Sequence, residues 1–154
     1  MVTLAFYKGR DQFFDRAIQT WSRGPYSHVE IIIGNTWYTS SPYDGGVRSK
    51  QIIPTEGHWD FITLDHIDPN SVLDWYILHA GKKYDFLGIA GFVIRPIKGF
   101  EHRYFCSEAI AEILGLDDPW RYDPNTLAGV VRRLALDQNQ VQHQYFNITP
   151  LIAA

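Results

Sequence analysis

The chain has 154 residues and a mass of 17.8 kDa, a size that suits one ordinary domain and is too small for two. Apolar residues make up 45% and charged residues 20% of the chain, which is the balance of a globular protein and not of a disordered one. The formal net charge of -3 gives no general attraction to a phosphate backbone, so we expect no nucleic-acid partner. We predict one domain over residues 1–154.

Targeting features are missing from the sequence. The opening residues, MVTLAFYKGRDQFF, lack the basic region, apolar run and small-residue cleavage site of a signal peptide. The apolar run FLGIAGFVI at 86–94 covers nine residues, whereas a membrane helix needs about 20. We expect no transmembrane segment and cytoplasmic synthesis without a signal peptide. An enzyme aimed at the cell wall would then be delivered by another route.

The first half of the chain has the pattern of a sheet with one helix. In the segment 11–21 apolar residues recur at helical spacing, and Asp11 can serve as the N-cap. The pair Gly34-Asn35 lies between two strand-like runs, which is a typical hairpin pattern. Strands are expected at Val2–Tyr7, His28–Ile33, Thr36–Ser41, 47–53 and Trp59–Leu64.

The second half is predominantly helical. Asp68 and Pro69 begin a predicted helix that ends near Ala80, before Gly81. An aromatic, glycine-containing connection follows at 82–100, which we expect to be partly helical. Further helices are predicted to begin near Cys106 and to span about 125–136, ahead of a Gln-rich segment and a short apolar tail. Helices combined with a contiguous antiparallel sheet indicate the α+β class.

The single cysteine lies where an apolar run becomes a helix. Cys106 occupies the middle of YFCSE at 104–108, so its thiol is expected in the first turn. Unpaired backbone N–H groups and the positive end of the helix dipole favour a thiolate there, which a nucleophile needs. The alternative is a lone buried cysteine that packs as a small apolar residue. A single cysteine also excludes a disulfide within the chain and fits a reducing compartment.

Among the six histidines, His28 has the most informative setting. It follows a Gly-Pro break at 24–25 and opens an apolar strand, so its side chain can point into a cleft while the backbone is held. The other five lie among polar or loop-like neighbours and are expected to be ordinary surface residues: His58, His66, His79, His102 and His143.

Four segments carry a resemblance to a known family. The segments YSHVEIIIG, GKKYDFLGIAG, YFCSEAIAEILGL and DPNTLAGVV occur in this order over roughly residues 3–130. This order resembles the permuted NlpC-type superfamily of papain-like cysteine hydrolases, with its YiiX- and YaeF-like members and, more distantly, the lecithin:retinol acyltransferases. The resemblance implies a circularly permuted papain-like fold, with an antiparallel sheet packed against the helix that carries the cysteine. It also implies that Cys106 attacks a carbonyl carbon while His28 takes and returns the proton.

The residue that orients His28 is less clear. Relatives place a polar residue on the strand after the histidine strand, and alignment to their hairpin favours Ser40. A two-residue loop gives a different answer, because its register puts Thr39 and Ser41 on the face of His28. Glu30 shares that face, but it lies about 7 Å further along the strand and ranks below the hydroxyls.

Three further residues are candidates for substrate binding. Tyr84 matches the Tyr-Asp element of the family, which implies a place in the cleft near the oxyanion, and Tyr26 and Glu108 flank the two catalytic segments. Asp85 is expected to cap a turn or a helix. No phosphate-binding Gly-Lys loop and no zinc-ligand spacing is present in the sequence, so we expect no metal and no organic cofactor.

The function that this resemblance implies is a thiol-dependent hydrolase. A cysteine peptidase or amidase would cut peptidoglycan peptides or another small amide through a Cys-His thioester. An acyltransferase or lipid hydrolase would use the same pair, with an apolar groove walled by residues 86–97. A third possibility is a degenerate module that kept the fold and binds a peptide, a glycan or a protein. The oligomeric state is left open.

Overall fold

The computed structural model describes residues 1–85 and 103–152, with side chains up to residue 138. Its centre is a five-stranded antiparallel sheet in the order β4-β3-β2-β1-β5, so the predicted α+β class is confirmed. The strands are β1 (Val2–Tyr7), β2 (His28–Ile33), β3 (Thr36–Ser41), β4 (Gly46–Lys50) and β5 (Trp59–Leu64). The helices are α1 (Phe13–Ser22), α2 (Pro69–His79), α4 (Cys106–Ile113) and α5 (Pro124–Ile152), with a short 3-10 turn η1 (Pro119–Arg121).

The β2–β3 hairpin has the two-residue loop that the sequence predicts. Ile33 pairs with Thr36, and Ile31 pairs with Tyr38. Gly34 has a φ of 58°, which glycine adopts without the steric cost that a Cβ would bring. This register confirms the strand-parity prediction, because it places the odd-numbered residues of β3 on the face that carries His28.

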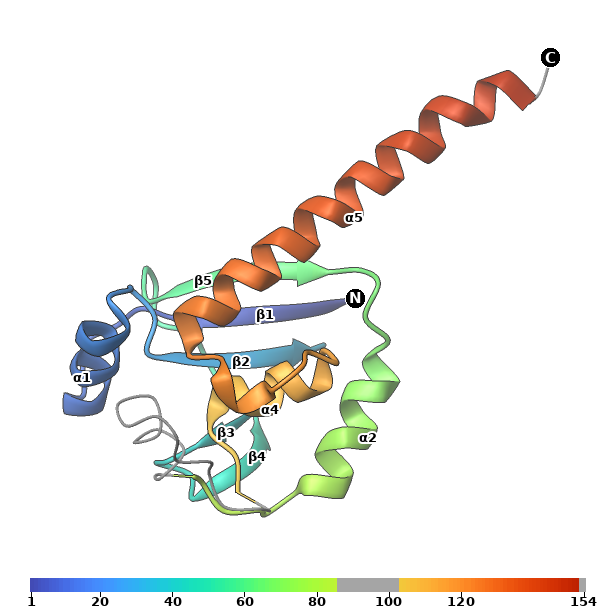
Figure 1. Ribbon diagram of the computed structural model, residues 1–154. Helices are drawn as coiled ribbons and strands as arrows, with labels where there is room; N and C mark the ends of the chain where they lie inside the picture. Colours follow the sequence, from blue (N-terminus) through green and yellow to red (C-terminus); the bar gives the residue numbers. More distant parts are fainter. Residues whose placement is uncertain (86–102, 153–154) are drawn as a thin grey trace.

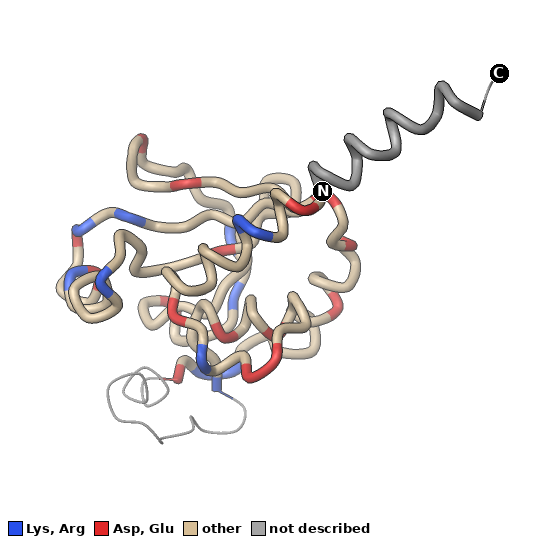
Figure 2. The backbone as a smooth tube through the Cα atoms, turned by 45° about the horizontal axis from the view of Figure 1, so that its top comes forward, with Lys and Arg blue, Asp and Glu red and all other residues tan. Residues whose placement is uncertain are grey.

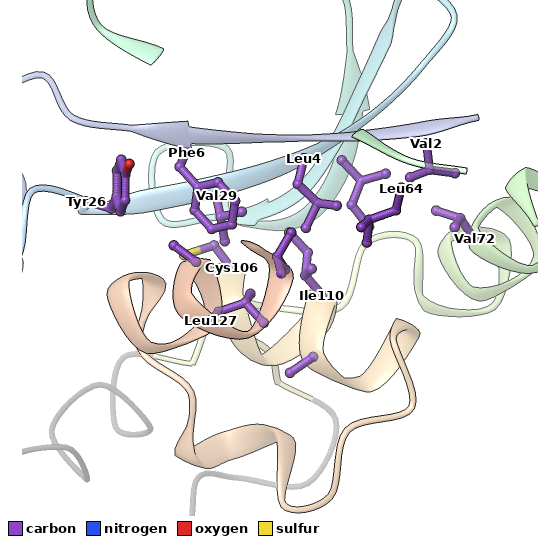
Figure 3. Packing of buried hydrophobic residues seen from close by; sticks show 14 of the residues in the cluster. Val2, Leu4, Phe6, Tyr26, Val29, Leu64, Val72, Cys106, Ile110 and Leu127 are labelled. Carbon is purple, nitrogen blue, oxygen red and sulfur yellow. The ribbon is translucent and has the colours of Figure 1, made fainter. Parts of the chain in front are cut away.

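The hydrophobic core lies between one face of the sheet and the helices α4 and α5. Figure 3 shows Ile110 of α4 and Leu127 of α5 beneath Leu4, Phe6 and Val29 of the sheet, and all five are fully buried. Burying a side chain of this size contributes roughly 1.5–3 kcal/mol. Since Ile110 lies one turn along the helix from Cys106, this packing also fixes the direction in which the cysteine points.

Helix α1 turns its polar side inward. Its two buried side chains are Asp15 and Gln19, and Gln19 donates from Nε2 to the carbonyls of Gly9 (2.9 Å) and Pro25 (2.8 Å). Of its apolar side chains, Phe14 is 46% exposed. Hydrogen bonds therefore attach α1 to the rest of the domain at the end of the sheet (Figure 1). The apolar side of α1 is not used for this attachment.

The beginnings of the first two helices differ in how well the sequence predicts them. Helix α1 begins at Phe13 with Gln12 as N-cap, one residue later than the predicted Asp11 cap, because Asp11 accepts a hydrogen bond from Tyr7 (2.6 Å) instead of capping the helix. The backbone N–H of Gln12 donates to Asp15 (3.0 Å). Helix α2 is confirmed, with Asp68 accepting from the N–H of the second helical residue.

Two further boundaries differ from the prediction. Strand β4 ends at Lys50 instead of residue 53. Helix α5 does not end near 136 but continues through the Gln-rich segment to Ile152, and Figure 1 shows it running past the edge of the sheet. Most of the predicted 82–100 connection, including the apolar runs at 86–94 and 86–97, lies outside the described residues.

Charged residues of both signs are interspersed over the described part of the chain (Figure 2). This distribution agrees with the small formal net charge. Among the described helices, none combines the length and the apolar character that crossing a membrane demands.

Candidate active site

Cys106 is the first residue of α4 and is 3% exposed. The chain before it is held at the carbonyl of Tyr104, which accepts from the hydroxyl of Ser40 (2.5 Å) and from the backbone N–H of Asp85 (3.2 Å). Phe105 is extended (φ −95°, ψ 168°) and buried, and the helix begins directly after it. The sulfur therefore lies at a fixed helix N-terminus, as the sequence predicts.

His28 is the first residue of β2, and Cys106 lies near enough to its imidazole to raise the pKa of His28. The start of its strand is held because the N–H of Ser27 donates to the carbonyl of Tyr7 (3.0 Å). The structure thus brings together the two groups that the sequence analysis proposes as nucleophile and base.

Glu30 is the carboxylate that contacts His28. Its Oε1 lies 3.3 Å from His28 Nε2, and its side chain is only 3% exposed. Arg48 of β4 binds both oxygens of Glu30 at 2.9 Å, and Asp44 accepts from Arg48 Nε (2.8 Å) and from Lys50 (2.9 Å). A bidentate guanidinium fixes a carboxylate in both position and plane. A chain of alternating charges therefore runs from His28 and Glu30 on β2 to Arg48 and Lys50 on β4.

The charges of this chain shift the protonation of its members. Burial acts to lower the pKa of His28, but the charge and hydrogen bond of Cys106, together with those of Glu30, outweigh it and raise that pKa to about 10. Burial acts to raise the pKa of Glu30, and His28 and Arg48 outweigh it and hold that pKa below its usual value. At neutral pH the imidazole is therefore a cation next to an ionised carboxylate.

The hydroxyl residues that the sequence analysis ranks first as partners of His28 have other contacts in the structure. Ser40 binds the Tyr104 carbonyl, and Thr39 donates to the carbonyl of Val29 (2.8 Å). Ser41 lies in the wall of a cavity beside His28. The sequence-based ranking placed Glu30 below these residues because it equated the 7 Å strand spacing with the distance between side chains. Because the side chains of His28 and Glu30 are long and lie on the same face, their ends come within 3.3 Å of each other.

Two cavities flank the Cys106–His28 pair. The apolar cavity, of about 220 Å³, is lined by Cys106 and Ser107 but not by His28. The polar cavity, of about 260 Å³, is lined by His28 and Glu30 but not by Cys106. Both cavities share four lining residues, namely Phe14, Ile18, Ser27 and Tyr84. The reactive pair therefore lies where an apolar space meets a polar one.

The three predicted substrate-binding residues lie in different places. Tyr84 lines both cavities and is buried. Tyr26 packs its ring against Phe6 in the core and donates its hydroxyl to Asp60 (2.7 Å). It lines neither cavity.

Glu108 also lines neither cavity. Its carboxylate accepts from the backbone N–H of Phe105 (3.3 Å), so it caps the N-terminus of α4. Burial, joined by the charges of Asp85 and Glu112, outweighs that hydrogen bond and raises the pKa of Glu108 to about 7. The carboxylate is therefore a destabilising charge above neutral pH.

The other histidines have separate contacts. His58 lies 3.5 Å from Asp11, His66 binds Gln138 (3.1 Å), and His79 stacks on Trp75 with ring centroids 4.0 Å apart. Residue 102 and the side chain at 143 are outside the described residues. Within the described ranges, no three His, Cys, Asp or Glu residues gather as metal ligands would.

A scan against models of protein families finds no match for this chain, and a search of curated proteins finds none either. The chemistry must therefore be argued from the geometry. A sulfur at a helix start, an imidazolium beside it and a buried carboxylate behind the imidazolium can together form and break a thioester.

Proposed function

We propose that the protein is a thiol-dependent hydrolase of the cysteine peptidase or amidase type, with a circularly permuted papain-like fold. The proposal is carried by the nearness of His28 to Cys106, the first residue of α4, which is close enough to raise the pKa of the imidazole. Glu30, 3.3 Å from the imidazole, supports it as the orienting carboxylate. A structural cysteine would need neither partner.

In the first half of the reaction, the Cys106 thiolate attacks the carbonyl carbon of an amide. The electron pair of the C=O bond moves to the oxygen, and the N–H groups at the start of α4 stabilise the oxyanion. When the oxyanion collapses, the C–N bond breaks and His28 gives its proton to the leaving amine. The products are a free amine and a thioester on Cys106.

In the second half, water attacks the thioester carbonyl while the now neutral His28 takes a proton from the water. The C–S bond breaks and the sulfur leaves as a thiolate, which restores the ion pair with the imidazolium. The product is a carboxylic acid. Glu30 keeps the imidazole in one orientation through both steps, and Arg48 holds Glu30 in place.

A second candidate function is favoured by the apolar cavity. Ala17, Ile18 and Phe105 line it next to Cys106, and such a wall suits the hydrocarbon part of an acyl group. Transfer of that group to an acceptor other than water would make the protein an acyltransferase or a lipid hydrolase. Mass spectrometry of trapped acyl-enzyme, after incubation with murein peptides or with acyl lipids, separates the two candidates.

The reactivity of the thiol tests the proposal against a non-catalytic binding module. Iodoacetamide reacts with the thiolate, and Cys106 is the only cysteine, so its rate reports on one site. The rate is measured across pH 5–9. At the acid end of this range we expect Cys106 to be alkylated at least about tenfold faster than a peptide cysteine, because the adjacent imidazolium retains the thiolate. His28→Ala should remove that advantage, and Cys106→Ala is the blank. Alkylation no faster than that of the peptide at every pH contradicts the proposal.

A further inference from the structure

A buried hydroxyl in the apolar cavity has no partner. Ser107 follows Cys106 in the first turn of α4, is fully buried, and lines the cavity. Its Oγ makes no hydrogen bond with any described residue. Buried polar side chains almost always have a partner, because an unpaired hydroxyl loses its bonds to water without replacement.

Tyr76 also has a buried hydroxyl without a partner, but it lines neither cavity, and the nearby serine hydroxyls are paired. Ser22, on α1, donates to the carbonyl of Ile18 (2.6 Å). Ser27, in the wall of the same cavity, donates to Asp15 (2.9 Å). The carboxylate of Asp123, also in that wall, caps the start of α5 through the N–H of Asn125 (2.8 Å). Ser107 differs from these paired groups, because its hydroxyl would give up no existing hydrogen bond to bind a ligand.

The position of the cavity decides which part of a substrate Ser107 meets, and this step depends on the proposed function. The leaving group must receive a proton from His28, so it lies on the side of the polar cavity. The acyl group bonded to the sulfur then extends the other way, into the apolar cavity. Since neighbouring Cα atoms are about 3.8 Å apart, the hydroxyl of Ser107 lies within reach of atoms one or two bonds from the reacting carbonyl.

We propose that Ser107 is a specificity-determining residue whose hydroxyl binds a polar group next to the reacting carbonyl of an otherwise apolar acyl group. An N-acylated amino acid with an aliphatic side chain has this chemistry. A plain fatty acyl chain lacks it and would leave the hydroxyl buried without a partner. A site built around a hydrogen bond rejects analogues that cannot make it. Ser107 therefore favours a peptide-like acyl group over a lipid one.

Two matched alkylating probes test this assignment. N-acetyl-leucine chloromethyl ketone carries an amide beside its ketone, and isopentyl chloromethyl ketone has the same hydrocarbon without the amide. Each reacts as the thiolate forms a C–S bond and chloride leaves with its electron pair. Rates are divided by those of N-acetylcysteine to remove intrinsic reactivity. We expect Ser107→Ala to slow the amide probe about tenfold and the other probe by less than twofold.

The control is Ser27→Ala, which removes a hydroxyl from the same cavity that already has a partner. The ratio of the two probe rates should stay at the wild-type value in this variant. Urea unfolding adds an independent measurement, because Ser107→Ala removes no bond and should not lower the unfolding midpoint.

The possible outcomes separate the two proposals. If Ser107→Ala slows both probes equally, or neither, the specificity role is wrong while the Cys-His mechanism stands. If wild-type protein reacts with neither probe faster than N-acetylcysteine does, the thiol is not activated and both proposals are overturned. A selective loss with the amide probe supports both.

Discussion

The two cavities beside Cys106 come from different parts of the fold. The apolar cavity is walled mainly by α1 and the start of α4, through residues such as Ala17, Trp21 and Phe105. The polar cavity is walled by strands of the sheet and carries Glu30 and Arg48. The comparison teaches that a helix and a sheet give the two sides of Cys106 different chemistry. Under the proposed function, the helix side would receive hydrocarbon and the sheet side would supply the charges that move a proton.

Helix α1 explains why the apolar side exists. An ordinary surface helix buries its apolar stripe against the core, but α1 is attached to the body by its polar residues Asp15 and Gln19. Its apolar residues Phe14 and Ile18 are left to line both cavities. Because α1 attaches through its polar side, its apolar side chains form the wall of the cavities beside Cys106 instead of packing into the core.

The largest expected effect tests the polar side. Glu30→Gln keeps the shape of the side chain but removes the charge beside His28, so the imidazolium is less stabilised and Arg48 loses one of its two ionic partners. We expect kcat to fall about 100-fold or more, as when the orienting carboxylate of a triad is replaced by an amide. The measurement is the turnover rate against a chromogenic amide or thioester.

The pH profile of the same variant checks the mechanism. Against the effect of burial, Cys106 and then Glu30 raise the pKa of His28 to about 10, and in the proposed mechanism the protonated form gives the proton to the leaving group. Without that charge the pKa falls, so the alkaline limb of kcat/KM should move to lower pH by about one unit. The control is Asp44→Asn, at the far end of the charge chain, which should shift the limb less. An unmoved limb in Glu30→Gln means that the carboxylate does not act through His28.

A smaller effect is expected on the apolar side. Ala17→Glu places a carboxylate at the wall of the apolar cavity, where hydrocarbon would have to contact it. KM for a hexanoyl thioester should rise about tenfold, while KM for the acetyl thioester, which does not reach that wall, stays within twofold. The matched control is Thr20→Glu, an exposed position of the same helix that lines neither cavity. Equal losses with both chain lengths would show that the cavity does not hold the acyl group.

The sequence predicts some features of this molecule well because their causes are local. The Gly34-Asn35 loop sets the register of the hairpin, and Asp68 begins α2 through its own side chain. The pairing of Glu30 with Arg48 could not be predicted in this way, because it depends on how β4 aligns with β3. A lone arginine on a predicted strand was the one available hint, since a buried guanidinium needs an acid.

The start of α1 and the length of α5 were mispredicted for related reasons. Asp11 has the residue type of an N-cap, but Tyr7 of β1 occupies its carboxylate, a tertiary contact that local patterns cannot show. The Gln-rich segment lacks an apolar stripe, so periodicity gave no reason to extend α5. Glutamine is nevertheless a good helix former, and the helix continues to Ile152.

The smallest expected effect concerns Glu108, which lines neither cavity. It tests the start of α4 on the side of Cys106 that faces away from the cavities. Its pKa is about 7 in the folded protein against 4.5 ordinarily, so between these values the folded state holds more protons than the unfolded one. The free energy of unfolding must therefore fall as pH rises from 4.5 to 7. Glu108→Gln keeps an acceptor for the Phe105 N–H and removes the charge. Above pH 7 it should be more stable than wild type by about 1–2 kcal/mol, after allowance for solvent screening, with the gain shrinking towards pH 5.

Urea titrations at pH 5 and 8 measure this difference in stability, with Glu56→Gln at an exposed position as the control. A gain that is the same at both pH values would mean that the charge of Glu108 is already solvated, and that the helix start behind Cys106 is as open to water as the polar cavity in front of it.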